Sequence, residues 1–140
     1  MDPTLFPLRP LPTSLTIPIE EASSDIDDLE KILGGRQWNA ISDGELRKLA
    51  YTFSLLTGEA MRYYLPSLLG CRVPEIAESA ILITCPTMSN SDQIDLEGLR
   101  RTFGPYSAQQ RAAVAQFLLP HRLEYTEIDQ AIREFWGNPP

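Results

Sequence analysis

Apolar side chains recur at helical spacing in several short stretches of this sequence, and a proline or glycine ends almost every one of them. In TGEAMRYYLPSLLG (57–70) they occupy positions i, i+3, i+4, i+7 and i+8, which form one face of an α-helix. Such stretches fill most of the 140 residues and leave little room for a sheet. The sequence therefore predicts an all-α fold, a compact single-domain bundle of about five to six helices over residues 1–140.

Helix starts are marked by side chains that can bond free backbone amides. Ser42 with Glu45, and Ser107 with Gln110, have the spacing of capping boxes, in which each side chain bonds the other residue's amide. Thr57 is predicted to cap the stretch quoted above. These signals and the apolar pattern place the helix starts at the same positions.

Pro66 lies inside the most helix-like stretch. Its ring removes a backbone hydrogen bond and costs a helix interior about 3 kcal/mol. We therefore expect a kink that tertiary packing holds in place. Tyr64 belongs to the buried stripe of this helix, so its hydroxyl needs a hydrogen-bond partner. The stretch is interpreted as a kinked core helix rather than as a binding motif.

The N-terminal part of the chain is too rich in proline to be helical. Five of the twelve prolines fall within residues 1–19, and proline favours extended backbone. The same residues are too apolar for a free tail. We expect an extended strap over residues 1–22, with a short strand near residues 14–19, packed on a helical body of residues 23–137.

The formal net charge of −7 at pH 7 restricts the class of partner. An acidic surface repels phosphates and argues against nucleic-acid binding. It attracts a basic protein and speeds the encounter with it; the alternative is that the charge only keeps the protein dissolved.

Targeting signals are missing from the sequence. Glu78 interrupts the most apolar run, residues 76–85, which is also too short to cross a membrane. The N-terminus lacks the basic head and unbroken apolar run of a signal peptide. We expect a cytoplasmic protein that binds no membrane.

Residues suited to catalysis or metal binding are few. His121 is the single histidine and has no nucleophile motif beside it. Cys71 and Cys85, at the two ends of an expected helix, would lie about 20 Å apart, beyond the roughly 7 Å that a disulfide allows. We interpret both as reduced thiols. The acidic run at 20–31 lacks the glycine and the twelfth-position glutamate of an EF-hand. We therefore predict no catalytic residue, no metal and no cofactor.

Acidic residues concentrate in two blocks that carry the whole excess of charge. Residues 1–35 hold seven acids and two bases, and residues 73–99 hold five acids and no base. A first helix starting near Ser23 or Ser24 and the loop 85–99 would form one acidic face if they lie on the same side. Such a face would imitate the phosphates that a basic protein groove binds. The candidate partner-binding residues are Asp25, Asp27, Asp28, Glu30, Asp92, Asp95 and Glu97. The alternative is two unrelated solvated patches.

Three motifs carry a family resemblance: RYYLP at 62–66, QRAAVAQFL at 110–118, and a terminal helix that ends in tryptophan. They resemble a family of small bacterial proteins without an assigned function. The matching residues are Arg62, Tyr63, Tyr64, Leu65, Pro66, Gln110, Arg111, Ala113, Val114, Phe117, Leu118 and Trp136. Ala108 and Gln109 depart from the family's proline and acid. The resemblance covers about residues 36–137 and implies a helical fold.

Small acidic proteins of this kind often accompany secreted bacterial toxins as immunity partners, which is an analogy. On that analogy we expect a non-enzymatic binding protein that blocks the basic active site of a toxin, such as a nuclease. Tyr63, Tyr106 and Tyr125 are expected to be exposed anchors of the interface. The alternatives are an assembly module that acts as a homodimer, and an enzyme with carboxylate chemistry.

Overall fold

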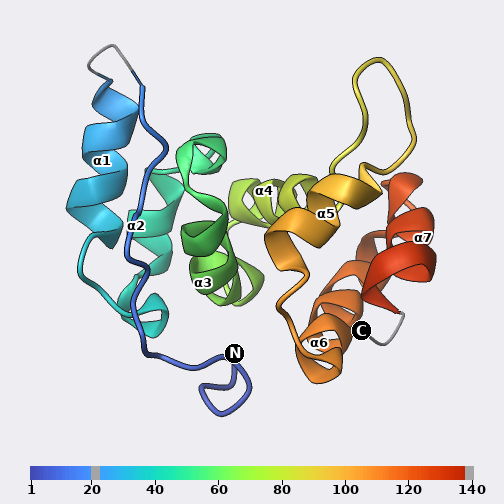
Figure 1. Cartoon of the computed structure of the whole chain (residues 1–140), viewed down its shortest axis with the longest axis horizontal. Helices are drawn as coiled ribbons and strands as arrows, with labels where there is room; N and C mark the ends of the chain where they lie inside the picture. The colour runs from blue at the N-terminus through green and yellow to red at the C-terminus, as the bar shows by residue number, and fades with distance from the viewer. Residues whose placement is uncertain (20–22, 138–140) are drawn as a thin grey trace. The chain divides into compact units, whose positions relative to one another are not determined.

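Helices dominate the computed structural model, which describes residues 1–19 and 23–137 (Figure 1). Those residues contain seven α-helices and no β-strand. Their bounds are α1 Ser24–Leu33, α2 Asp43–Arg47, α3 Gly58–Leu69, α4 Pro74–Thr84, α5 Leu96–Phe103, α6 Ala108–Leu118 and α7 Glu127–Ala131. Three 3-10 turns, Trp38–Ala40, Phe53–Leu55 and Leu119–His121, and a π-helical segment, Ile132–Trp136, complete the helical elements.

The all-α prediction is confirmed, but the predicted number of helices, five to six, is too low. α2 and α7 have only five residues each. Isolated helices of this length are unstable in water, so packing against the rest of the chain has to maintain them.

The chain divides into two compact units, residues 1–80 and residues 81–140, and each is described by itself. The expected single domain over residues 1–140 stays a prediction.

The predicted helix caps are confirmed. Ser42 accepts a hydrogen bond from the Glu45 amide at 3.1 Å, and the Glu45 carboxylate accepts one from the Ser42 amide at 3.1 Å. Ser107 and Gln110 form the same reciprocal pair at 3.1 and 2.8 Å. Thr57 caps α3 through the Ala60 amide at 3.1 Å.

Pro66 lies inside α3 and is buried. The helix continues past it and ends before Gly70. The carbonyl of Pro66 accepts the Gly70 amide at 3.2 Å, which closes the last turn. The kink at Pro66 stays a prediction.

The hydroxyl of Tyr64 connects α3 to the end of α1. It lies 2.7 Å from the carbonyl oxygens of both Leu33 and Arg36, which supply the partner that the sequence requires. Ser67, one turn further along α3, donates to the Trp38 carbonyl. The buried face of α3 in unit 1 is therefore held by polar as well as apolar contacts.

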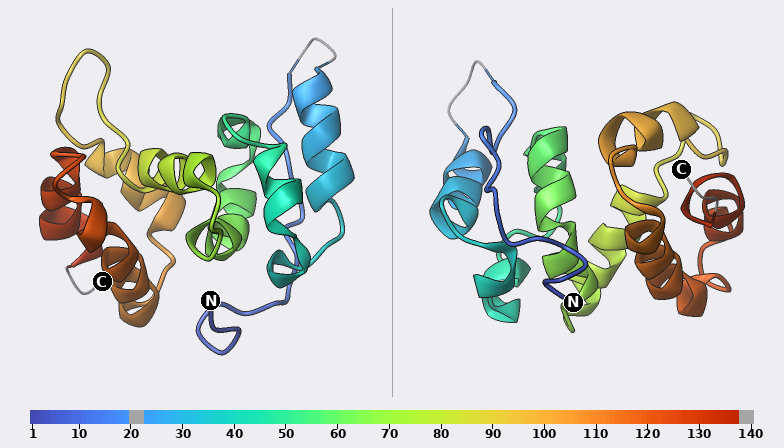
Figure 2. Two further views of the ribbon diagram at one scale, coloured as in Figure 1. Left: turned by 180° about the vertical axis from the view of Figure 1, so that it is seen from behind. Right: turned by 60° about the horizontal axis from the view of Figure 1, so that its bottom comes forward.

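The N-terminal segment, defined as residues 1–19, contains no helix and runs as a long dark-blue trace beside α1 (Figures 1 and 2). An isolated antiparallel bridge joins Thr16 to Leu56. The Ile17 amide donates to the Leu55 carbonyl at 2.8 Å. The short strand predicted near residues 14–19 is therefore wrong, because this single bridge does not extend into a ladder. Residues 20–22 of the predicted strap lie outside the described residues, and one continuous strap stays a prediction.

Unit 2 has an aromatic core. The rings of Phe103, Tyr106 and Phe135 surround that of Trp136 at centroid distances of 5.3, 6.3 and 4.8 Å. The indole N–H of Trp136 donates to the Thr84 carbonyl at 2.7 Å. The π-helical segment brings Phe135 and Trp136 into this core and ends before Gly137.

Candidate partner-binding surface

The acidic residues predicted on the first helix lie on α1. Asp25, Asp27, Asp28 and Glu30 are all exposed, whereas Leu29 and Leu33 are buried. Asp25 and Asp27 lie in the first turn, where carboxylates interact favourably with the helix dipole. Ser23, rather than Ser24, is the cap and accepts a bond from the Asp25 amide at 3.2 Å. α1 therefore presents four carboxylates to solvent from a fixed backbone.

No ion pair neutralises Asp25, Asp27 or Asp28 within residues 1–19 and 23–137. Glu30 has one long contact, 3.5 Å from the hydroxyl of Thr16. The charge of the helix is therefore available to a basic partner.

The second predicted group lies in unit 2, in the loop before α5 and in its first turn. Asp92 and Glu97 are exposed. Asp95 is half-buried and caps α5, since its Oδ1 accepts the Gly98 amide at 3.0 Å. Asp95 thus has a structural role within the chain that the sequence interpretation missed. An aspartate directly before a predicted helix is an ordinary N-cap, and this position was the signal available in the sequence.

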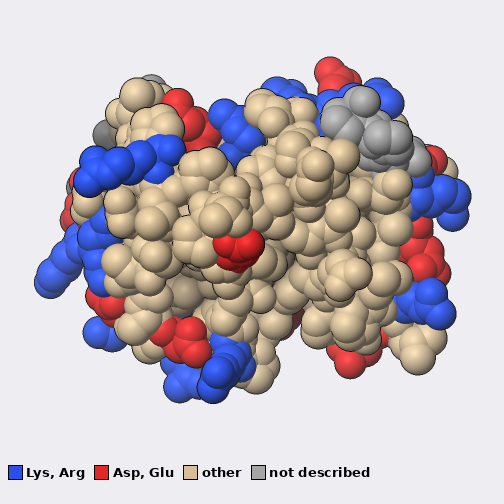
Figure 3. Space-filling view, turned by 90° about the horizontal axis from the view of Figure 1, so that it is seen from below, with Lys and Arg blue, Asp and Glu red and all other residues tan. Residues whose placement is uncertain are grey.

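The structure does not bring the two groups into one described surface, because they belong to different units. Figure 3 shows one side of the protein, where acidic and basic side chains intermix among uncharged ones. The single acidic face therefore stays a prediction, and the acidic surface of α1 is the larger of the two groups.

Of the three tyrosines expected to anchor a partner, Tyr106 contradicts that expectation. It is 6% exposed because its ring packs in the aromatic core of unit 2. Tyr63 is half-buried, and its hydroxyl donates to the Leu8 carbonyl at 2.6 Å. Tyr125 is half-buried. Tyr51, which the sequence did not single out, is 65% exposed and has a positive φ of 69°.

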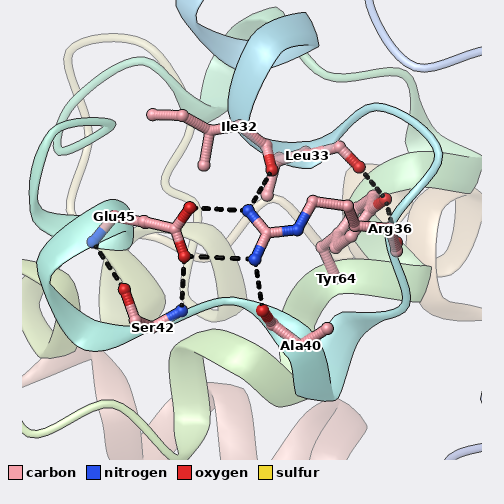
Figure 4. Close-up of polar contacts among 7 residues, drawn as sticks. All are labelled: Ile32, Leu33, Arg36, Ala40, Ser42, Glu45 and Tyr64. Atoms are coloured by element: carbon pink, nitrogen blue, oxygen red, sulfur yellow. Dashed lines mark hydrogen bonds and ion pairs between the residues drawn. The ribbon is translucent and has the colours of Figure 1, made fainter.

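A polar cluster centred on Arg36 and Glu45 connects elements of unit 1 (Figure 4). The guanidinium meets the carboxylate through two N–O contacts of 2.6 and 3.1 Å. It also donates to the carbonyls of Ile32, at 3.0 Å, and Ala40. Bidentate pairs of this kind are the strong form of an ion pair. The cluster joins the end of α1 to α2, and the capping box is the part of it that the sequence predicted.

The electrostatics of this cluster are those of a structural element. The hydrogen bonds from Arg36, and next those with Ser42, lower the pKa of Glu45 to about 2. Burial raises the pKa of Tyr64 to about 12. Glu45 therefore stays charged and Tyr64 neutral at physiological pH, which suits a permanent brace.

The side chains that could bind a metal or react chemically do not form a cluster in the described part of the chain. No set of three His, Cys, Asp or Glu side chains that could hold a metal ion occurs among the residues the structure describes. The ring of His121 packs against that of Phe117 at a centroid distance of 5.4 Å, with the two planes tilted by 44°. Cys71 and Cys85 are free and buried, and burial raises the pKa of both thiols, that of Cys85 to about 12.

Arg111 is buried in unit 2 beside none of the acidic residues discussed above. Its guanidinium lies 4.3 Å from the centroid of the Phe135 ring and donates to the Gly104 carbonyl at 3.2 Å, at the C-terminal end of α5. Burial lowers the pKa of this guanidinium. The side chain binds α5 and the π-helical segment to α6 and is enclosed by them.

In the described part of the chain, no helix is long and apolar enough to cross a membrane.

Comparison with known proteins places most of the chain in one family. Residues 16–139 match the model of a family described as "Family of unknown function (DUF6714)". The match begins earlier than the resemblance seen in the sequence, since it includes α1 and the last residues of the N-terminal segment. Neither the curated proteins nor the solved structures contain a match.

Proposed function

The chain belongs to the family of unknown function DUF6714, and we propose that it is a non-enzymatic binding protein whose acidic helix α1 occupies the basic site of a protein partner. The partner is a secreted bacterial toxin domain such as a nuclease, and the chain is its immunity protein. It acts in the cytoplasm, binds neither nucleic acid nor membrane, and uses no cofactor. The described part of its proline-rich strap, residues 1–19, packs on the rest of unit 1.

The exposed carboxylates of α1, which no ion pair neutralises within the described residues, carry this proposal. Asp28 and Glu30 lie beyond the first turn, so the helix dipole does not compensate them as it does Asp25 and Asp27. Leu29 and Leu33 are fully buried and hold the helix in place. Carboxylates fixed in this way need little reorganisation to meet a basic surface, which favours fast association.

Asp92 and Glu97 supply a second acidic contact in unit 2. Asp95 contributes to that contact mainly by fixing the start of α5.

The test begins with the genes that flank the one for this chain. A flanking gene for a secreted effector should encode a domain that stops growth when expressed alone and permits growth when the chain is expressed with it. Association of the purified pair should then slow as salt is added, because salt screens charges beyond about 8–10 Å.

Charge-neutral variants separate acidic recognition from general acidity. Asp25→Asn, Asp27→Asn and Asp28→Asn together should slow association roughly tenfold at low salt. The matched control removes three exposed acids elsewhere, through the substitutions Glu75→Gln, Glu124→Gln and Asp129→Asn. Equal association rates for the two triple variants would rule out α1 as the recognition element. The immunity function itself is lost as an explanation if neither flanking gene product binds the chain.

A further inference from the structure

The N-terminal segment is held in unit 1 largely through its own backbone. The indole N–H of Trp38 lies 3.1 Å from the Phe6 carbonyl oxygen and 3.3 Å from that of Pro7. The hydroxyl of Tyr63 donates to the Leu8 carbonyl at 2.6 Å and accepts the Trp38 amide at 3.2 Å. Two aromatic side chains therefore recognise three successive carbonyls of the segment.

A second set of contacts fixes the next part of the segment. The hydroxyl of Thr57 donates to the Ser14 carbonyl at 2.7 Å, and the Thr57 amide donates to the Leu15 carbonyl at 2.9 Å. The carboxylate of Glu59 accepts from the amide and the hydroxyl of Thr13. These contacts are again made mainly to backbone groups of the segment, and the Thr13 hydroxyl is the one side chain among them.

This pattern is the chemistry by which proteins bind extended proline-containing peptides. Proline at positions 3, 7, 10 and 12 keeps the segment out of helices and removes four amide donors. Within the segment the Asp2 carbonyl accepts the Leu5 and Phe6 amides, whereas the carbonyls of Phe6, Pro7 and Leu8 accept from aromatic side chains, as those of extended proline-containing peptides do in aromatic grooves. Phe6, which is 3% exposed, supplies one buried anchor.

The segment lies on the surface as a ligand does. Its exposed residues include Pro7, Arg9, Pro10, Thr13 and Ser14. The match to the family model begins at residue 16, so residues 1–15 make these contacts from outside the matched part of the chain. Their partners Trp38, Thr57, Glu59 and Tyr63 all lie inside it.

We propose that Trp38, Thr57, Glu59 and Tyr63 form a peptide-binding site for an extended, proline-containing segment, and that residues 6–15 occupy this site in cis. The site is separate from the acidic residues of α1 and does not depend on the proposed immunity function. A peptide from another protein has to displace the chain's own segment. Its apparent affinity is therefore its intrinsic affinity multiplied by the fraction of molecules in which the segment is unbound.

The test uses the whole chain with residues 20–22 replaced by the recognition site of a specific protease. The protein is folded first and then cleaved, which leaves the N-terminal segment bound without a covalent link. The probe is a synthetic peptide of residues 1–19 with a fluorophore after Ile19, an exposed residue. Its fluorescence anisotropy should rise saturably as it replaces the unlabelled segment, while the helical circular dichroism of the body stays unchanged.

Two controls define specific binding. A scrambled peptide of the same composition should bind at least tenfold more weakly. Tyr63→Phe removes the bond to the Leu8 carbonyl and should weaken the probe roughly three- to tenfold, whereas Tyr51→Phe, at an exposed tyrosine, should leave it unchanged. Equal binding of the two peptides overturns the site, and so does loss of helical signal on cleavage, because the segment would then be part of the core.

Discussion

Replacing Tyr64 by phenylalanine removes one hydroxyl from the centre of unit 1 and leaves the ring in place. Tyr64 is 3% exposed, and its hydroxyl lies 2.7 Å from the carbonyl oxygens of Leu33 and Arg36. The Leu33 carbonyl keeps a second donor, the Arg36 amide at 3.0 Å. The loss therefore falls mainly on the Arg36 carbonyl.

The expected loss of unfolding free energy follows from that count. One hydrogen bond contributes about 1 kcal/mol, and a buried acceptor left without its donor costs about 1–3 kcal/mol. Since one of the two carbonyls keeps a donor, we expect Tyr64→Phe to destabilise the protein by about 1–2 kcal/mol. Tyr51→Phe is the matched control, because Tyr51 is exposed, and it should change stability by less than about 0.5 kcal/mol.

Urea unfolding followed by circular dichroism measures both variants, and alkaline pH adds a second signature. Burial raises the pKa of Tyr64 to about 12, while the phenol ionises near 10 in the unfolded chain. The folded state therefore holds this proton more tightly, and the stability it contributes below pH 10 is lost between about pH 10 and 12. Tyr64→Phe should lessen that alkaline loss. A variant as stable as Tyr51→Phe, with an unchanged alkaline profile, would refute the assignment of this hydroxyl as a brace.

Three further perturbations probe other contacts. Glu45→Gln should remove an acid-sensitive contribution to the free energy of unfolding. The pKa of Glu45 is lowered to about 2, so the stability that this carboxylate gives the wild type above about pH 4.5 is lost toward pH 2. Urea unfolding of both proteins at pH 7 and pH 3 measures the difference. Asp95→Ala removes the cap of α5 and should cost about 1 kcal/mol, whereas Asp92→Ala, in the exposed loop, should cost less than about 0.5 kcal/mol; equal losses in thermal unfolding contradict the cap. Arg111→Lys should destabilise more than Arg111→Met by about 1 kcal/mol in urea unfolding, because a compact ammonium cannot lie flat on an aromatic ring; the reverse order contradicts stacking.

Helix ends were predictable because caps involve residues close in the sequence. The pairs Ser42–Glu45 and Ser107–Gln110 need only a spacing of three residues. Gly70 and Gly137 follow the last helical residues of their segments for a similarly local reason. Hydrogen bonds within one helical turn can therefore be predicted from the spacing of residues in the sequence.

Contacts between elements were less predictable. Arg36 and Glu45 are nine residues apart and meet only because the 3-10 turn at 38–40 redirects the chain. Tyr106 is buried by Phe103 and Trp136, which come from two different elements. Their positions depend on packing that no local pattern contains. For the Arg36 cluster, a signal beyond the capping box was an arginine just after a helix end, since cations favour the helix C-terminus.

The candidate surface was predictable in part. The exposure of Asp27 and Asp28 follows from the helical spacing of Leu29 and Leu33, which fixes the buried side of α1. Asp25 lies four residues before Leu29, on the same stripe, and its exposure at the first turn does not follow from that spacing. Whether distant acidic segments share one face depends on tertiary structure and has no such local signal.

The two tryptophans of the chain lie one in each unit, Trp38 in residues 1–80 and Trp136 in residues 81–140. Both are buried, and both indole N–H groups donate to carbonyls of their own unit. Indole fluorescence responds to such surroundings, so each ring reports on the unit that encloses it. Trp38→Phe and Trp136→Phe therefore convert the protein into two single-emitter forms. Their denaturation curves, compared at one wavelength, measure whether the halves of the chain melt as one cooperative body or in succession.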